Sequence, residues 1–459
     1  MLKILSEKNI LIFILFIAFF TRSASLGVFM YKNNLNIDES GITAYPKNDD
    51  SQLYYHTAKN IAEGKGYSIT IADKDQKLAG SFKTSPIPDT YYHNFYPPVY
   101  PTFLGILSHF FGTSIFVYAI PQIILGTISC YLTYVIAKEA FSPKIGLMAC
   151  FLLSIYHPIV WWTSYIRAET LFIFLLLLTI IFLIKAVKNN LDTKNMVISG
   201  IFLAVSFLCR NVILCLPMFI IFYFIIVFFK NNKKRLLYST IIFLASFYVT
   251  LLPWAYRNYT LYGQFSITTT EDWDTFYICN VISADLPFFD LHEVKYERDI
   301  EDEISLLMLS KGTKEASVAF VKKYPSKYIK LCLKRFIAYW SPITKKPSLI
   351  KKVVDTFIYI IVFPMAFWGF YKSKWWVISG STGLRPIPAL LMTVILYYTI
   401  LHSLVGVDDA LIYRYPIIPL ICIFSAYGYY AYFTRIGHRP TLVNTDKTLE
   451  SVMEQKIDT

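Results

Sequence analysis

The chain alternates between long apolar runs and polar segments. A helix that crosses the hydrocarbon core of a bilayer needs about 20 predominantly apolar residues, and ten segments reach or approach that length. These segments cover residues 9–31, 113–137, 145–162, 168–185, 195–209, 211–229, 236–256, 353–371, 386–405 and 415–434. The pattern therefore predicts an all-α polytopic membrane protein with about ten transmembrane helices.

Two long polar stretches interrupt the apolar runs, at about 32–98 and 257–350. Both should form loops outside the membrane. The transmembrane domain then covers residues 1–435, and residues 436–459 form a short polar tail. No repeat of 20–50 residues and no low-complexity tract is present.

Two further segments predict helices that lie along the membrane surface. Residues 99–112 are apolar but too short to span, and they follow a Pro-Pro pair, so we expect an interfacial helix there. It extends the first outer loop to about 32–112. Residues 302–340 carry mixed charge at helical spacing and predict one or two helices on the membrane.

The positions of Lys and Arg predict the orientation of the helices, because short cytoplasmic loops are enriched in both. Basic short loops occur near residues 138–144, 185–194, 230–235 and 372–385. They fall on one side only if 195–229, which is too long for one helix, forms two short helices that turn near Arg210. Both termini are then cytoplasmic and both long loops face outward, across what we expect to be a bacterial plasma (inner) membrane.

The first apolar run has some features of a secretory signal peptide. Lys3 and Lys8 precede its core, and Ser-Ala-Ser follows at 23–25. The apolar run resumes through Leu26 to Tyr31, which makes the segment long enough to span. We therefore expect an uncleaved first helix.

Composition supports the membrane assignment and excludes other classes. Apolar residues make up 55% of the 459 residues and charged residues only 16%, less charge than a soluble surface requires. The net charge of +13 lies mostly in loops between apolar runs, so we predict no nucleic-acid partner. The seven Cys are scattered without C-x-x-C or zinc spacing and predict small buried side chains.

Asp50 stands at the start of a predicted amphipathic helix in the first outer loop. Leu53, Tyr54 and Ala58 recur at helical spacing after it, and Gly64 ends the helix. An Asp in this position commonly serves only as a helix cap, and the local pattern alone favours that role.

Six motifs occur in order along the chain. They are Arg22; the first-loop set Asp50-Ser51, Gly64-x-Gly66-Tyr67, Tyr96-Pro97-Pro98-x-Tyr100-Pro101 and Phe111-Gly112; Ala168-Glu169-Thr170-Leu171-Phe172; Gly200 through Leu208-Cys209-Arg210; Leu252-Pro253-Trp254-Ala255-Tyr256-Arg257-Asn258-Tyr259; and Arg414-Tyr415-Pro416-x-x-Pro419. Together they resemble the lipid-dependent membrane glycosyltransferases of the C-type fold. These are the protein-mannosyltransferase-like and aminoarabinose-transferase-like enzymes, glycosyltransferase family 39 and its relatives. The resemblance covers about residues 10–435.

The resemblance implies an enzyme that takes a sugar from a polyprenyl-phosphate donor and transfers it, with inversion, to a hydroxyl on the outer face of the membrane. The leaving group is a lipid phosphate, already a weak base, so the reaction needs a base for the acceptor hydroxyl but no general acid. The resemblance assigns that role to Asp50, with Asp49 as the alternative. Glu169 is the candidate for a second acid that orients the acceptor or assists Asp50.

Arginines are the candidates for binding the donor phosphate, because the guanidinium fork can bind two phosphate oxygens. By resemblance and topology they are Arg22, Arg210, Arg257 and Arg414. The alternative is that these side chains snorkel to the interface. For Arg414, a further alternative is pairing with one of the acids at 408–409.

Candidates for further substrate contacts in the first loop are Tyr54, Tyr55, His93 and Tyr96. None of the seven His has metal-ligand spacing, so no cofactor is predicted. A divalent cation between Asp50 and the phosphate is the alternative. Arg167 departs from the family pattern, which leads us to expect a small or apolar residue there.

These motifs do not set the sugar or the acceptor, which can be a lipid, a glycan or a protein. The second long loop carries no family signature. Rival interpretations are another enzyme that uses a lipid carrier, such as an oligosaccharide ligase or polymerase, a membrane transporter, and an inactive relative that acts as a scaffold. A transporter would predict internal repeats and charges near the middle of the bilayer.

Overall fold

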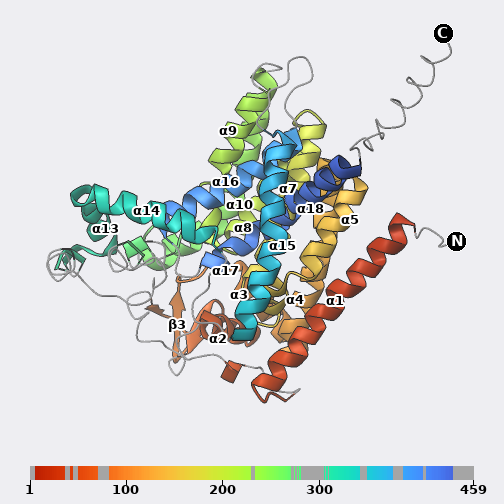
Figure 1. Cartoon of the computed structure of the whole chain (residues 1–459). Coiled ribbons are helices and arrows are strands. Elements are labelled where there is room, and N and C mark those ends of the chain that lie inside the picture. The colour runs from red at the N-terminus through yellow and green to blue at the C-terminus, as the bar shows by residue number, and fades with distance from the viewer. Residues whose placement is uncertain are drawn as a thin grey trace, which may run out of the picture.

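The computed structural model of the chain contains a bundle of long helices, with a small sheet and shorter helices gathered at one end (Figure 1). The structure describes residues 6–36, 42–44, 50–70, 82–228, 233–269, 273, 276–277, 279–280, 304, 306–308, 310–341, 349–375, 386–406 and 410–437. Asp49 lies outside the described residues.

Eight helical segments among the described residues are long and apolar enough to cross a membrane. They are α1 (Glu7–Lys32), α4 (Ile115–Ala140), α7 (Glu169–Lys188), α9 (Leu216–Phe228) with the short helix η4 (Asn211–Ile213) before it, α10 (Lys233–Tyr262), α15 (Leu349–Ser373), α16 (Pro386–Val405) and α18 (Ile418–Gly437), which α17 (Ala410–Arg414) and η6 (Tyr415–Ile417) precede. A continuous helix satisfies its own backbone hydrogen bonds, as lipid requires. The predicted helical polytopic fold is confirmed.

One predicted span is divided in two. The run 145–162 forms α5 (Pro143–Ser154) and α6 (His157–Trp162). Pro158 explains the break, because it has no N–H and its ring would clash with the carbonyl of Ser154 in a continuous helix.

The long run 195–229 forms two helices, as the distribution of charge predicts. α8 (Thr193–Phe207) is shorter than a full span. It ends just before Arg210, and η4 and α9 follow. The predicted turn near Arg210 is therefore present.

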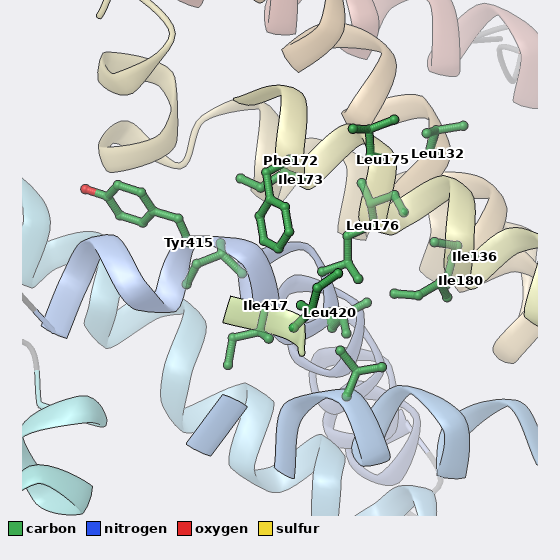
Figure 2. Close-up of a cluster of buried hydrophobic side chains, with 14 of the residues drawn as sticks. Leu132, Ile136, Phe172, Ile173, Leu175, Leu176, Ile180, Tyr415, Ile417 and Leu420 are labelled. Carbon is green, nitrogen blue, oxygen red and sulfur yellow. The ribbon is translucent and has the colours of Figure 1, made fainter. Parts of the chain in front are cut away.

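The centre of the bundle is an apolar core shared by α4, α7 and α18. Figure 2 shows Phe172, Leu176 and Ile180 of α7 close to Ile136 of α4 and Leu420 of α18. All five side chains are at most 1% exposed. In lipid, helix association depends on close packing rather than on removal of apolar surface from water, so the fit of these side chains holds the bundle together.

Two glycines let α15 and α18 approach closely. A Cβ added at Gly428 of α18 would lie 1.9 Å from the carbonyl oxygen of Met365, and one at Gly369 of α15 would lie 1.9 Å from that of Phe424. Small residues allow the backbones of membrane helices to come together in this way.

The first long loop forms two α-helices, a short 3-10 helix and a small sheet in its described part. Its elements are η1 (Ile42–Ala44), α2 (Asp50–Ala62), β1 (Ser68–Thr70), β2 (Phe82–Thr84), β3 (Thr90–His93) and α3 (Val99–Phe111). The helices predicted from Asp50 and over 99–112 are both present. A small antiparallel sheet with strand order β1-β3-β2 accompanies these helices and was not predicted. Strands of three or four residues are too short to produce a readable alternation.

Backbone contacts fix this loop to the bundle. The Val99 N–H at the start of α3 donates to the carbonyl of Leu208, just after α8, at 2.9 Å. A Cβ at Gly105 of α3 would lie 2.7 Å from Cγ2 of Ile61, so α2 and α3 pack closely there. Together these contacts place the start of α2 at the end of the bundle.

In the second long loop the helices α13 (Thr313–Lys323) and α14 (Pro325–Tyr339) are described from end to end. They fall within the stretch 302–340, where one or two helices were predicted. Figure 1 shows both projecting sideways from the bundle, beyond α16.

The close approach of α15 and α18 yields a stability prediction. Gly428→Ala should lower the thermal unfolding temperature in detergent, because overpacking costs about 1–3 kcal/mol. Gly27→Ala in α1 is the matched control, since a Cβ there meets nothing within 4 Å. Alanine is the better helix former by about 1 kcal/mol, so this control should leave the unfolding temperature unchanged or raise it. Equal shifts in the two variants would contradict the packing described here.

Candidate active site

Asp50 is the first residue of α2, where the positive end of the helix dipole stabilises a carboxylate. Its Oδ1 accepts a hydrogen bond from the Tyr96 hydroxyl at 2.6 Å, and its Oδ2 accepts one from Arg167 Nη1 at 2.5 Å. The Asp50 side chain is nevertheless 44% exposed. Because each carboxylate oxygen can accept more than one hydrogen bond, Asp50 can still receive the hydroxyl of a substrate.

The two partners of Asp50 come from distant parts of the chain. Tyr96 lies between β3 and α3 and packs against Tyr54 of α2, with ring centroids 4.6 Å apart. Arg167 lies between α6 and α7, and its guanidinium carbon lies 6.0 Å from the ring centroid of Trp162. The packing of both partners holds the carboxylate of Asp50 in one orientation.

A second ion pair lies next to the first. Glu169, the first residue of α7, accepts a hydrogen bond from Arg210, which follows α8. Glu169 is buried, and its Oε2 has no hydrogen-bond partner among the described residues. The guanidinium carbon of Arg210 lies 5.8 Å from the ring centroid of Tyr413.

The two pairs form one cluster of alternating charge. Arg167 and Glu169 are two residues apart at the entry to α7, and Asp50 lies within electrostatic range of Arg210. Two acids and two guanidiniums thus share one end of the bundle with formal charges that balance. A phosphate that entered here would meet two cations already fixed in position.

The other first-loop candidates are mainly packing residues in the structure. His93 is fully buried, with Nε2 2.9 Å from the Thr57 hydroxyl and its ring 4.7 Å from that of Tyr67. Burial, and secondly the charge of Arg257, lowers the pKa of His93 to about 3, so the side chain stays neutral near pH 7. Tyr54 is buried, and Tyr55 is half-buried.

Arg257 lies near the carboxyl end of α10, among aromatic rings. Its guanidinium carbon is 4.7 Å from the ring centroid of Trp254, 5.2 Å from that of Tyr67 and within 6.0 Å of Tyr92 and Tyr262. It also donates to the backbone carbonyl of Tyr67. Arg257 therefore joins the sheet of the first loop to the end of α10.

Arg414 is fully enclosed. Its guanidinium donates to the carbonyls of Tyr339 at 2.6 Å and Ser341 at 3.1 Å, at the carboxyl end of α14, and lies over the ring of Phe363. Asp408 and Asp409, the alternative partners, lie outside the described residues.

Arg22 is also fully enclosed, within the bundle. It donates to the carbonyl of Ala18 at 2.9 Å and to Sγ of Cys130 at 3.5 Å, and it packs over Gly126 of α4. The structure thus brings Asp50, Glu169 and Arg210 together, whereas Arg22 lies in the interior of the helix bundle.

The interpretation of the sequence missed the contact between Arg167 and Asp50. Its only sign was that Arg167 departs from the expected small or apolar residue. Tyr96 was predicted as a candidate for contact with substrate, and its hydroxyl donates to Asp50. A charged residue in an apolar context near a helix start is the signal that could have identified this partner.

The described residues contain no group of three or more His, Cys, Asp or Glu placed to hold a metal ion. Asp50 and Glu169 are each engaged by an arginine. This donor set does not fit a cation site built from the described side chains alone.

Residues 96–254 match the sequence profile of the dolichyl-phosphate-mannose-protein mannosyltransferase family. The matched segment includes Tyr96, Arg167, Glu169 and Arg210 of the cluster. No curated protein sequence matches the chain.

Solved structures show the same fold. The oligosaccharyltransferase of Archaeoglobus fulgidus in its apo form superposes with a TM-score of 0.55 at 14% identity, over 98% of this chain and 52% of its own. The same archaeal protein in complex with an inhibitory peptide and a dolichol-phosphate gives a TM-score of 0.54, also at 14% identity, over 98% and 54%. The chain spans about half the length of these archaeal structures.

ArnT from Cupriavidus metallidurans bound to undecaprenyl phosphate superposes less well, with a TM-score of 0.40 at 10% identity, over 91% of this chain and 76% of its own. The archaeal superpositions and the profile match agree with the resemblance drawn from the motifs. The chain is a polytopic helical membrane protein with the C-type fold of the lipid-dependent glycosyltransferases.

Proposed function

We propose that the protein transfers a sugar from a polyprenyl-phosphate donor to a hydroxyl acceptor at the outer face of its membrane, with Asp50 as the general base. The observation that carries this proposal is the half-exposed Asp50 carboxylate, oriented by Arg167 and Tyr96 beside a second acid–arginine pair. The archaeal structure of the same fold with bound dolichol-phosphate supports a lipid-phosphate donor.

The base is needed for the acceptor. An alcohol is a poor nucleophile until its proton is removed as it attacks, and a positioned carboxylate can accept that proton. The oxygen attacks the anomeric carbon from the face opposite the phosphate, the bond from carbon to phosphate oxygen breaks, and the configuration inverts. The proton ends on Asp50, and the lipid phosphate leaves as an anion.

Arg210 is the best-placed cation for that phosphate. Its side chain is 24% exposed, whereas Arg414 and Arg22 are fully enclosed. Charge that develops on the leaving phosphate is stabilised most by donors fixed in advance, because they need no reorganisation during the reaction. The contact of Arg210 with buried Glu169 fixes it in this way, and Arg167 adds a second cation nearby.

The second acid has a distinct role. Glu169 is held by Arg210, and its Oε2 faces no hydrogen-bond donor among the described residues. Because that oxygen is buried, Glu169 assists Asp50 by fixing Arg210 in position beside it. Transfer of a whole oligosaccharide, in place of one sugar, is the second candidate function, because the archaeal structures of this fold are oligosaccharyltransferases.

The role of Asp50 predicts a selective loss of transfer. Asp50→Asn should slow transfer about 100- to 10,000-fold, the usual contribution of a positioned base, while donor binding persists. Transfer from radiolabelled polyprenyl-phosphate sugars, single and oligomeric, to membrane extract measures both candidate functions. Asp89→Asn on an exposed turn is the matched control. Undiminished transfer in Asp50→Asn would move the base to Asp49 or Glu169.

The role of Arg210 predicts weaker donor binding. Arg210→Gln should weaken binding of polyprenyl phosphate about 10- to 100-fold, because charge-assisted hydrogen bonds contribute about 1.5–3 kcal/mol. The single variant also leaves Glu169 buried without its partner, which destabilises the fold. The double variant Glu169→Gln/Arg210→Gln removes both charges, so it should recover thermal stability but not donor affinity. Donor affinity at the wild-type level in the double variant would exclude Arg210 as the phosphate ligand.

A further inference from the structure

α14 divides its surface into three sectors. At about 100° per residue, one sector faces the protein and includes buried Leu331, Arg335 and Tyr339. A second sector, next to it around the helix, is apolar and exposed. The third carries lysines, and the sequence of α14 contains no acidic residue.

The exposed apolar sector is large for a single short helix. Its members are Ile329, Leu333, Phe336 and Ile337, which are 59%, 61%, 48% and 55% exposed. They recur at spacings of three, four and eight residues, so they form one continuous stripe. In water such a stripe would be a liability, whereas at a bilayer it is the face that inserts.

The lysine sector lies beside this stripe. Lys327, Lys330 and Lys334 recur at spacings of three and four residues, about 100° around the helix from the apolar stripe. A lysine at the edge of an inserted face can extend its amine to the headgroup layer while its stem stays in apolar surroundings. The positive charge of this edge attracts the phosphate groups of lipids.

Hydrogen bonds set α14 at the end of a transmembrane helix. Tyr328 donates to the carbonyl of Leu404 at 3.0 Å, next to the last residue of α16. Arg335 donates to the same carbonyl at 3.4 Å and to Asn280 Oδ1 at 2.8 Å, as well as to the Cys279 carbonyl. Since α16 spans the membrane, α14 lies at the depth where that span ends.

The end of α16 in question is the one that carries the candidate active site. The ring of Tyr339, at the carboxyl end of α14, stacks on His402 with centroids 5.5 Å apart. The ring centroids of His402 and Tyr413 are 4.9 Å apart, and the guanidinium of Arg210 lies over the ring of Tyr413. α14 therefore borders the leaflet from which a lipid-linked donor would enter.

We propose that α14 is an interfacial helix that binds acidic phospholipid headgroups of this leaflet. Its apolar stripe inserts at the boundary between acyl chains and headgroups, and Lys327, Lys330 and Lys334 bind lipid phosphates beside it. The ligand class is an anionic glycerophospholipid. This site is separate from the Asp50 cluster and does not depend on sugar transfer.

The position of the stripe is tested with the full chain in nanodiscs. A dansyl-bearing amino acid replaces Leu333 in one sample and Lys330 in another, and quenching by brominated lipid is measured in each. Strong quenching at Leu333 and weaker quenching at Lys330 are expected. If Leu333 escapes quenching, a second copy of the chain or another protein covers the stripe, and the proposal fails.

Headgroup binding is tested by retention of phosphatidylglycerol over phosphatidylcholine in mixed nanodiscs, read by native mass spectrometry. The triple variant Lys327→Gln/Lys330→Gln/Lys334→Gln should lose acidic-lipid preference, with about fivefold lower affinity for each lysine removed. The matched Lys→Arg triple keeps the charge and should retain the preference. Unchanged retention in the Gln triple overturns the proposal. Neither assay reads sugar transfer, so failure here is distinct from failure of the proposed activity.

Discussion

Charge removed from water must be compensated nearby, and this constraint organises one end of the helix bundle. Asp50, Arg167, Glu169 and Arg210 alternate in sign there, and each pair joins segments far apart in the sequence. Removing Arg210 would cost about 3–5 kcal/mol, because the buried Glu169 charge would remain without compensation. The half-exposed Asp50 pair contributes less to stability. The pairs therefore hold the first loop, the start of α7 and the end of α8 in register, and they fix the charges that the proposed chemistry uses.

The same constraint explains the enclosed arginines. Arg414 and Arg335 donate to backbone carbonyls at or just beyond the carboxyl ends of α14 and α16, respectively. Carbonyls at the end of a helix carry partial negative charge and lack partners within the helix. A guanidinium satisfies several of them at once, so these residues connect the second long loop to the bundle. That structural role separates them from the partly exposed Arg210.

The sequence predicts most of the helical architecture but little of the geometry between elements. Hydrophobic length predicts the spans, and the distribution of charge correctly places a turn near Arg210. Pro158 divides one expected span into two helices, because proline breaks a helix even where the sequence is apolar throughout. Hydropathy alone does not predict this break. The sheet of the first loop is too short to leave a periodic signal. The contact of Arg167 with Asp50 joins residues 117 positions apart, and no spacing rule reports such a contact.

The candidate site could be predicted residue by residue but not as an arrangement. Asp50, Glu169 and Arg210 stand in motifs that resemble the family, and the structure brings them together. His93 belonged to the same loop and has the same polar character, yet its ring is buried against Thr57 and Tyr67. Whether a polar side chain faces a substrate or the interior depends on packing across elements, which a single sequence does not encode locally.

The most direct test of the central claim is a double-variant cycle on sugar transfer with Asp50→Asn, Arg167→Gln and the two substitutions together. Arg167 donates to the Asp50 carboxylate, so most of its effect on transfer should disappear once that carboxylate is gone. We expect the double variant to transfer sugar about as slowly as Asp50→Asn alone. Losses that multiply in the double variant would contradict the assignment of Asp50, held by Arg167, as the catalytic base.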